Sequence, residues 1–287
     1  MASVGVVIHP ERELAAELAR DAAGWLTERG HDVRLPLADA GIAKLQELGV
    51  PEALFSRGLD VAVCLGGDGT MLRTVDLVAA DGVPVVGVNV GQLGYLTEVK
   101  PQGLRMALKR FLAGSYEVEE RMLIQVTVDS AEPTEIEERT HLALNEVVLE
   151  KTPMGHTVRL GVSVDGDFFT PYAADGLIVS TPTGSTAYAF SARGPIVAPT
   201  HRCLLLTPVS PHMLFDRSLV LDPAASVRLE VLGNRPATLS VDGRTLATLD
   251  GGDSITVTAA AKAARLVMFG QRDFLRILKT KFGLSDR

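Results

Sequence analysis

The chain has 287 residues, 46% of them apolar, which is enough for about two domains with buried cores. Its formal net charge is −7 and its 28 lysines and arginines are scattered, so the sequence excludes the basic footprint of a nucleic-acid binder. We find no basic targeting segment and no apolar run of roughly 18 residues. The two cysteines, Cys64 and Cys203, make neither a disulfide framework nor a zinc site. We therefore predict a cytoplasmic protein that binds neither nucleic acid nor membrane.

The first 118 residues alternate apolar runs with amphipathic segments. Strands that alternate with helices form a parallel sheet with helices on both faces, and ligands of such sheets bind at the carboxyl ends of the strands. We therefore predict a Rossmann-like parallel α/β domain over 1–118. Its predicted strands are 4–8, 33–35, 59–65 and 83–89, its predicted helices are 11–29, a helix that opens at Thr70, and 104–112, and 38–58 is left unassigned.

From about Tyr116 onward, strand-like runs follow one another with few helices between them. This pattern predicts a mostly antiparallel β-sandwich domain over 119–264. Asp165-Gly166 and Asp242-Gly243 each separate two alternating runs, as tight hairpin turns do, and 251–254 is interpreted as a further hairpin turn. The predicted strands are 122–129, 142–150, 158–164, 177–180, 203–206, 227–232, 237–241 and 255–258.

The last segment of the chain is helical again. Phe274, Leu275, Leu278 and Phe282 recur in helical register within 273–282. Because one face of this helix is apolar, we predict that it packs back on the first domain, so that 265–287 return to it.

A glycine-rich segment, Gly66-Gly67-Asp68-Gly69-Thr70, directly follows the strand predicted at 59–65. A loop without side chains at a helix N-terminus lets backbone N–H groups approach a phosphate, and the helix dipole favours the negative charge. A carboxylate is costly there unless it takes a proton from a substrate hydroxyl or faces Mg²⁺. The segment therefore predicts a phosphate cradle, with Asp68 placed by a bend that only glycines make; a tight turn with a solvated aspartate is the alternative.

Two further segments combine polar side chains with buried-type strands. Asn145-Glu146 interrupts the apolar run 142–149, and its amide and carboxylate suit ribose hydroxyls and adenine edges, although a structural pair is equally compatible. Asp175 opens the other segment, in which a strand runs into five hydroxyl residues before a short helix at 186–191. We interpret this cluster as a polar ligand pocket rather than as capping alone, and Tyr188 offers a flat face for a base.

Together these segments resemble the NAD kinase family, which carries GGDGT, an NE dipeptide in a strand and a DGxxxSTPTGSTAY block. Their order and spacing match over nearly the whole chain, most weakly before Leu59. The resemblance implies phosphorylation of the adenosine ribose 2′-hydroxyl of NAD by ATP, or in some members by polyphosphate, with Mg²⁺ bound through the nucleotide phosphates. It also implies a homodimer or homotetramer in which a neighbouring subunit completes the site.

The resemblance assigns the phosphate side of the reaction to the glycine segment. Asp68 becomes the general base on the ribose hydroxyl and, with Gly69, part of the NAD site. The ATP loop comprises Gly66, Gly67, Gly69 and Thr70, with Arg73 one turn later as a charge partner. Since a general base contributes on the order of 10²-fold or more, we expect Asp68→Asn to abolish most turnover and to leave NAD binding measurable.

The dinucleotide side falls on the later segments. By resemblance, Asn145 and Glu146 hold the adenosine part, Asp175 contacts the nicotinamide part, and His156 contacts the dinucleotide. The other implied NAD-binding residues are Thr186, Ala187, Tyr188, Ala189, Phe190 and Ser191.

Two positions depart from the family pattern. Arg193 stands where members usually have glycine, in Ser191-Ala192-Arg193-Gly194-Pro195, and Ala173 stands where some members have arginine. Arg193 is hypothesised to replace the missing charge. Two alternatives stay open: a kinase of the same fold that acts on another hydroxyl compound, such as a nucleoside or a lipid, and a non-catalytic dinucleotide-binding sensor. Retention of Asp68 argues against the sensor, and the absence of an amphipathic membrane helix argues against a lipid kinase.

Overall fold

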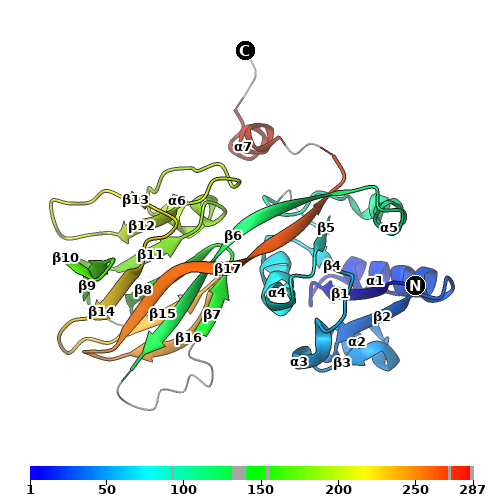
Figure 1. Ribbon diagram of the computed structural model, residues 1–287, viewed down its shortest axis with the longest axis horizontal. Coiled ribbons are helices and arrows are strands. Elements are labelled where there is room, and N and C mark those ends of the chain that lie inside the picture. Colours follow the sequence, from blue (N-terminus) through cyan, green and yellow to red (C-terminus); the bar gives the residue numbers. More distant parts are fainter. Residues whose placement is uncertain (92–93, 131–139, 153–155, 271–272, 285–287) are drawn as a thin grey trace. The chain divides into compact units, whose positions relative to one another are not determined.

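The computed structural model describes residues 1–91, 94–130, 140–152, 156–270 and 273–284. The chain divides into two compact units, one formed by Met1–Glu120 with Ala264–Arg287 and the other by Arg121–Ala263. Two strands, β6 (Glu117–Asp129) and β17 (Ser254–Met268), carry the chain from one unit into the other (Figure 1).

A parallel sheet forms the centre of the first unit. Its strand order is β5-β4-β1-β2-β3, and the end of β17 adds to β5 where Leu266 pairs in parallel with Val85. β1 pairs in parallel with β2 and β4, β4 with β5, and β2 with β3, which confirms the predicted parallel α/β fold. The strands are β1 (Ser3–Ile8), β2 (Asp32–Pro36), β3 (Gly49–Val50), β4 (Val61–Gly66) and β5 (Val85–Asn89).

Helices cover both faces of this sheet because side chains alternate along each strand. Val4 and Val6 of β1 share a core with α1, α2 and α5. On the opposite face, glycine at 5 leaves room for Phe55 of α3, and glycine at 87 leaves room for Met71 of α4. The helices are α1 (Glu13–Thr27), α2 (Leu37–Ala43), α3 (Glu52–Phe55), α4 (Asp68–Val78) and α5 (Leu104–Leu112), with short 3₁₀ turns at Gln46–Leu48, Ala79–Asp81 and Pro101–Gly103.

The second unit is a sandwich of two antiparallel sheets. One contains β10-β9-β14-β17, with β6 beside β17 and β7 beside β6, and the other has the order β13-β12-β11-β8-β15-β16. Apolar side chains from both sheets, such as Leu160, Leu229, Val179 and Leu239, form one core, as predicted for a sandwich. The remaining strands are β7 (Thr140–Ala143), β8 (Glu146–Lys151), β9 (Val158–Val164), β10 (Asp167–Ala174), β11 (Gly176–Ser180), β12 (Leu204–Val209), β13 (Leu219–Leu221), β14 (Val227–Val231), β15 (Ala237–Val241) and β16 (Arg244–Leu249).

The two Asp-Gly turns form as predicted. Asp165 and Gly166 have φ of 53° and 90°, and Asp242 and Gly243 have φ of 47° and 78°, which is the pattern of two-residue hairpin turns. They join β9 to β10 and β15 to β16, and the register of these pairs shifts once in each, between Phe168 and Thr170 and between Leu239 and Ser240. The turn at 251–254 is not a hairpin, because β16 and β17, which flank it, belong to different sheets.

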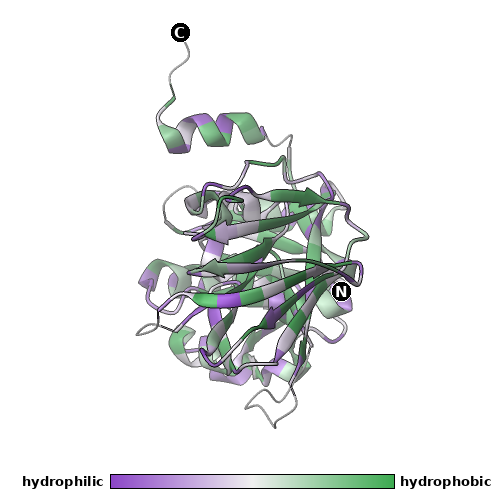
Figure 2. Cartoon of the chain, turned by 90° about the vertical axis from the view of Figure 1, so that its left-hand side faces the viewer, coloured by the Kyte–Doolittle hydropathy of each residue, from purple (hydrophilic) through white to green (hydrophobic). Residues whose placement is uncertain are grey.

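The end of the chain returns to the first unit mainly through β17. Arg265 Nη1 donates to Gly82 O at 3.0 Å, and Arg110 Nη1 donates to Phe269 O at 2.7 Å. The predicted final helix forms as α7 (Phe274–Phe282), but none of its residues is buried, and Lys281 lies 4.2 Å above the ring of Tyr95. In Figure 2 this helix is the one beside the label of the C-terminus, and hydrophobic and hydrophilic residues alternate along it.

Candidate active site

The glycine segment joins β4 to α4. β4 ends at Gly66, Gly67 precedes the first helical residue, and α4 begins at Asp68, two residues before the helix that the sequence pattern predicted. Asp68 and Gly69 therefore belong to the first helical turn, whose N–H groups have no partners within the helix. The carboxyl end of a parallel strand and the N-terminus of an 11-residue helix thus meet here, as a phosphate cradle requires.

The three glycines, Gly66, Gly67 and Gly69, differ in how much space surrounds them. None of them has a positive φ, so the expectation that only glycines can make this bend is wrong. A Cβ on Gly66 would overlap the side chain of Thr70, whereas a Cβ on Gly67 or Gly69 would meet no atom within 4 Å. Neither backbone conformation nor packing within the protein demands glycine at 67 and 69, and the open space above them lets a ligand approach the amides.

The carboxylate of Asp68 is held by the backbone of the segment that follows β5. Tyr95 N–H donates to Oδ2 at 2.8 Å, and Leu96 N–H donates to Oδ1 at 3.0 Å. A Cβ on Gly94 would overlap Oδ1, so glycine at 94 permits this close approach. Each carboxylate oxygen keeps a further lone pair, so Asp68 can still accept a proton while the two amides fix its orientation.

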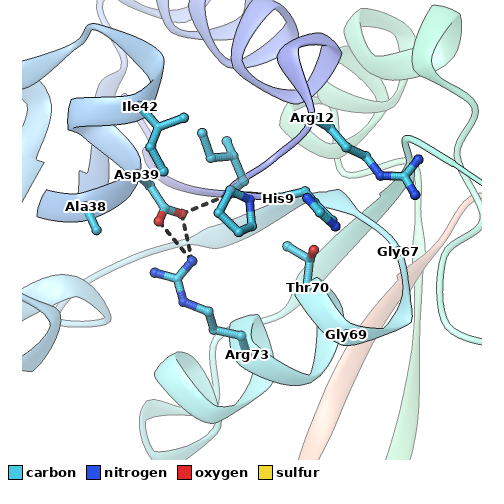
Figure 3. Close-up of a pocket in the computed structure, with 11 residues that line it drawn as sticks. His9, Arg12, Ala38, Asp39, Ile42, Gly67, Gly69, Thr70 and Arg73 are labelled. Carbon is cyan, nitrogen blue, oxygen red and sulfur yellow. Dashed lines mark hydrogen bonds and ion pairs between the residues drawn. The ribbon is translucent and has the colours of Figure 1, made fainter.

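A cavity of about 470 Å³ lies beside the glycine segment, within the size range of small-molecule sites. Its walls come from the β1–α1 loop, from α2 and from the start of α4 (Figure 3). His9, Arg12 and Asp39 line it, and no sequence pattern singled them out, because they come from separate segments without a common spacing. Gly67 and Gly69 border the same space, which places the predicted phosphate loop on a cavity.

Arg73, the charge partner suggested by resemblance, lines this cavity but already has acidic partners. Its Nη1 lies 2.8 Å from Asp39 Oδ1, and its Nη2 lies 3.2 Å from Glu52 Oε1. Asp39 is buried and accepts a hydrogen bond from Ile8 N–H at 2.8 Å. Burial raises the pKa of Asp39, and the Ile8 amide and Arg73 oppose this shift. The charge of Arg73 is thus largely balanced within the protein.

The second unit has its own cluster of candidate residues, at the start of β8. The strand predicted over 142–150 is in fact two strands, with Asn145 in the break between them. The carboxylate of Asp242 causes this break, because it accepts hydrogen bonds from the N–H groups of Leu144, Asn145 and Glu146 at 2.8, 2.8 and 3.0 Å. Asp242 therefore fixes the NE dipeptide from a hairpin turn about a hundred residues away in sequence.

Glu146 is buried, with 6% of its surface exposed. Burial first, and the charge of Asp242 second, raise its pKa to about 8, while the hydrogen bond from the Tyr188 amide lowers it. Among the described residues, neither Glu146 Oε2 nor the Oγ of Ser180, its cross-strand neighbour on β11, has a hydrogen-bond partner. Buried polar atoms are rarely left unpaired, so these two atoms are candidates for contacts with a ligand.

The hydroxyl groups after β11 mostly bond within the chain. The side-chain oxygens of Thr181, Ser185 and Thr186 each donate to a nearby main-chain carbonyl. These bonds hold the turn from β11 through a 3₁₀ turn (Gly184–Thr186) into α6 (Tyr188–Ser191). The bonds of Ser185 and Thr186 are local, as in the alternative of capping alone, whereas Thr181 bonds to Leu144, 37 residues earlier in the chain.

The other predicted dinucleotide residues lie in α6, just before it, and at His156 and Asp175. Ala189 is buried, whereas Tyr188, Phe190, Ser191 and His156 are exposed, and Ala187 is half-buried. The Tyr188 hydroxyl donates to Glu150 Oε2 at 3.4 Å, and the Lys151 Nζ lies 2.8 Å from Asp175 Oδ1. The carboxylate of Asp175 is therefore paired within the protein.

Arg193, which departs from the family pattern, ends α6 with φ of 67°. Its N–H donates to Phe190 O at 3.0 Å, and Gly194 N–H donates to Ala189 O at 2.7 Å. This pair of bonds is a Schellman motif, whose left-handed residue is most often glycine. The backbone thus keeps the conformation that glycine favours, with an arginine in its place.

Over the described ranges, no group of three or more His, Cys, Asp or Glu side chains is arranged to hold a metal ion. None of the helices in these ranges has both the length and the apolar character needed to cross a membrane. Cys64 and Cys203 are both free and buried.

The two parts of the chain match two family models, the ATP-NAD kinase N-terminal domain over residues 4–116 and the ATP-NAD kinase C-terminal domain over residues 144–269. A protein called NAD kinase from Heliobacterium modesticaldum is 44% identical over 283 residues, which are 98% of each chain. The chain belongs to the NAD kinase family. A further NAD kinase, from Geobacter metallireducens, is 39% identical over 272 residues, 94% of each chain.

Solved structures of the NAD kinase family share the fold. The yeast NADH kinase complexed with NADH has a TM-score of 0.88 at 25% identity, and the match covers 100% of this chain and 89% of that one. An NAD kinase from Archaeoglobus fulgidus in complex with ATP has a TM-score of 0.73 at 26% identity, over 97% and 98% of the two chains. The resemblance drawn from three short motifs is confirmed across both domains.

Proposed function

We propose that the protein transfers the γ-phosphoryl group of ATP to the 2′-hydroxyl of the adenosine ribose of NAD, giving NADP and ADP, with Asp68 as the general base. The observation that carries the proposal is the arrangement of the glycine segment. A carboxylate oriented by two backbone amides stands in the first turn of α4, between two glycines whose faces are open to a cavity. A tight turn with a purely structural role does not require open space above its glycines.

The chemistry follows from these groups. The ribose oxygen attacks the γ-phosphorus, its proton passes to an Asp68 carboxylate oxygen, and the bond from phosphorus to the β,γ-bridging oxygen breaks as ADP leaves. A ribose hydroxyl is a poor nucleophile, so a carboxylate within hydrogen-bond reach lowers the barrier by taking the proton. Alignment and charge neutralisation supply most of the remainder in phosphoryl transfer. The N–H groups at the start of α4 and the helix dipole act on the phosphate charge.

Mg²⁺ arrives with ATP in this proposal. The cation commonly keeps several waters and binds through substrate phosphates and one or two carboxylates, rather than in a cage made by the protein. The oxygens of the nucleotide phosphates would hold the ion, and Asp68 is the carboxylate of the glycine segment that could face it. The ion would neutralise charge on the β- and γ-phosphates.

The second unit supplies the groups proposed to bind the dinucleotide. Asn145 and Glu146 bind the adenosine part, supported by the buried and unpartnered Oε2 of Glu146. Asp175 binds the nicotinamide part and His156 contacts the dinucleotide; the other contacts come from 186–191. The family resemblance further supports a homodimer or homotetramer that completes the site.

The two alternatives draw no support from the comparisons. The relatives that match nearly the whole chain are called NAD kinases, and the two solved structures are complexes with NADH and with ATP. A nucleoside kinase or a non-catalytic sensor therefore explains less than a dinucleotide kinase does.

The test uses purified protein with ATP, Mg²⁺ and NAD, and an NADP-specific dehydrogenase reports the product. Asp68→Asn is expected to lower kcat by on the order of 10²-fold or more, since a general base contributes that much, with the NAD Kd changed only a few-fold. Asp167→Asn, at an exposed aspartate of β10, is the matched control. Turnover of Asp68→Asn close to that of the unaltered protein would disprove the role of Asp68.

A further inference from the structure

The two Asp-Gly hairpin turns of the second unit hold a neighbouring strand in the same way. In each turn the aspartate carboxylate accepts a hydrogen bond from the N–H of one residue, and the aspartate N–H donates to the carbonyl of that same residue. Asp165 holds Ser226 in this way, with distances of 2.8 and 2.9 Å. Asp242 holds Glu146, with 3.0 Å for both bonds. Ser226 directly precedes β14 and Glu146 is the first residue of β8, so each turn fixes the start of a strand.

The Asp242 carboxylate also holds two residues that lie between strands. Its oxygens accept hydrogen bonds from the N–H groups of Leu144 and Asn145, each at 2.8 Å, and these two residues follow β7 and precede β8. The start of a strand requires only the bond to its first residue, as the Asp165 turn shows. A carboxylate that accepts three successive N–H groups fixes the backbone of all three residues. The two additional bonds therefore fix the backbone on the N-terminal side of Glu146.

The backbone of Asn145 is held from the other side as well. Thr181 N–H donates to Asn145 O at 2.9 Å, and a Cβ on Gly184 would lie 2.1 Å from the same oxygen, so glycine at 184 permits this close approach. The half-buried side-chain amide of Asn145, by contrast, has no hydrogen-bond partner in the part of the chain that the structure describes. A rigid backbone that carries an unengaged polar group suits ligand binding, because little ordering remains to be done when the ligand arrives.

Asp242 acts on the Glu146 side chain too. Burial first, and the charge of Asp242 second, raise the pKa of Glu146 to about 8, while the hydrogen bond from the Tyr188 amide lowers it. Among the described residues, Asp242 from the hairpin turn and Tyr188 from α6 are the titratable groups that face Glu146, and Ser180 is its neighbour on β11. One carboxylate thus acts on both residues of the NE dipeptide.

We propose that Asp242 is a positioning residue for the dinucleotide, whose carboxylate holds Asn145 and Glu146 so that their side chains meet the adenosine part of NAD. The inference rests on the proposed function, which assigns the adenosine part to these two side chains. Asp242 itself contacts no substrate in this scheme and acts through the residues that it holds. Loss of its carboxylate should therefore weaken the binding of NAD and not that of ATP, which the proposed function places at the glycine segment.

Calorimetric titration of the full chain with NAD tests this role without turnover. Asp242→Asn keeps a side chain that tolerates a positive φ, but it offers one oxygen to three N–H groups and turns an amide donor toward one of them. The Kd for NAD is expected to rise by about 10-fold or more, since one charge-assisted hydrogen bond is lost and the others become neutral. In the coupled assay KM for NAD should rise similarly, with kcat and KM for ATP within about twofold, a split that a general loss of stability does not produce.

Asp165→Asn is the matched control. Asp165 occupies the same kind of turn, with φ of 53° against 47° for Asp242, and its carboxylate holds Ser226 rather than the NE dipeptide. Asp165→Asn should leave the Kd for NAD within about twofold of that of the unaltered protein, as exposed substitutions usually do. Asp242→Ala removes all three bonds and should weaken NAD further, with Asp165→Ala as its control; if Asp242→Ala does not fold, Asp242→Asn decides. Unchanged NAD binding by folded Asp242→Asn, or equal weakening by Asp165→Asn, would overturn the proposal.

The pH dependence of NAD binding gives an independent readout. Because Glu146 contacts the adenosine part in this scheme, the Kd for NAD should change near pH 8, where Glu146 loses its proton in the folded protein. Asp242→Asn removes a negative charge that raises the pKa of Glu146, so this change should move to lower pH. Kd profiles of the two proteins that change at the same pH would overturn the link between Asp242 and Glu146.

Turnover separates this inference from the proposed function. If the unaltered protein forms NADP and Asp242→Asn binds NAD as tightly as it does, the kinase assignment stands and the role of Asp242 is wrong. If Asp242→Asn weakens NAD as expected but the unaltered protein forms no NADP, the role of Asp242 stands and the kinase assignment is wrong.

Discussion

Gly69→Ala is expected to raise the stability of the protein and to lower its activity. A methyl group at 69 fits within the folded protein but would occupy the space of the proposed phosphate. Gly69 lies in the first turn of α4, has no positive φ, and a Cβ there would meet no atom within 4 Å. Alanine in place of glycine lowers the entropy of the unfolded chain and favours the helix, by about 0.4–1 kcal/mol. We therefore expect the free energy of unfolding to rise by roughly 0.5 kcal/mol.

The activity should change in the opposite direction. The methyl group would stand where a phosphate oxygen must approach the amides of the first turn, and it would remove one or two charged hydrogen bonds of about 1.5–3 kcal/mol each. At 1.4 kcal/mol per factor of ten, kcat/KM for ATP should fall by about 10- to 100-fold or more.

Urea denaturation and the coupled NADP assay measure the two effects on the same preparation. Gly24→Ala is the matched control, because Gly24 lies within α1 with nothing within 4 Å of a Cβ and away from the cavity. It should gain about 0.5–1 kcal/mol of stability with unchanged kinetics. If kcat/KM of Gly69→Ala for ATP stays within twofold of the unaltered protein, the proposal that a phosphate binds at Gly69 is refuted. If the variant loses more than about 1 kcal/mol of stability, the statement that a Cβ at 69 meets no other atom is refuted.

Two other perturbations test particular features. Arg193→Gly should raise the free energy of unfolding by about 1 kcal/mol, because glycine adopts the left-handed conformation at 193 without strain; an unchanged urea midpoint would contradict this. Glu146 has a pKa of about 8 in the folded protein, well above its ordinary value of 4.5, so the folded state keeps a proton that the unfolded state loses. Stability should therefore fall as the pH rises from about 4.5 to about 8 and level off above it, by up to about 5 kcal/mol. Glu146→Gln should remove this dependence, and urea curves at pH 5.5, 7 and 8.5 that run parallel for the two proteins would show that Glu146 does not carry it.

Elements with a continuous local signal could be predicted from sequence. The helix over 104–112 and the strands over 158–164 and 237–241 have the predicted bounds, because turn residues or a change of pattern mark both ends of each segment. Short elements carry no such signal: α2 has seven residues and α3 has four, which is too few to establish a helical period within 38–58.

The site was predictable where its residues are adjacent in the chain and not where folding brings them together. The glycine segment revealed Asp68 and its neighbours, but not the amides of Tyr95 and Leu96 that orient the carboxylate. The break before Glu146 depends on Asp242, 96 residues later, and so no local pattern contains it. Arg12, from the loop before α1, and Asp39, from α2, line one cavity, which sequence spacing does not record.

The strand β17 makes the first unit dependent on a segment that follows the whole second unit in the chain. Leu266 pairs with β5, and Val267 belongs to the core built around α1 and β1. Val99 pairs with the end of β5 at Val88, but the start of β5 at Val85 lacks its β17 neighbour until the second unit has been translated, and unpaired strand edges attract other chains. A chain terminated before Leu266 would lack both the neighbour of Val85 in β17 and the Val267 side chain of that core, so the first unit is completed only after β17 has been translated.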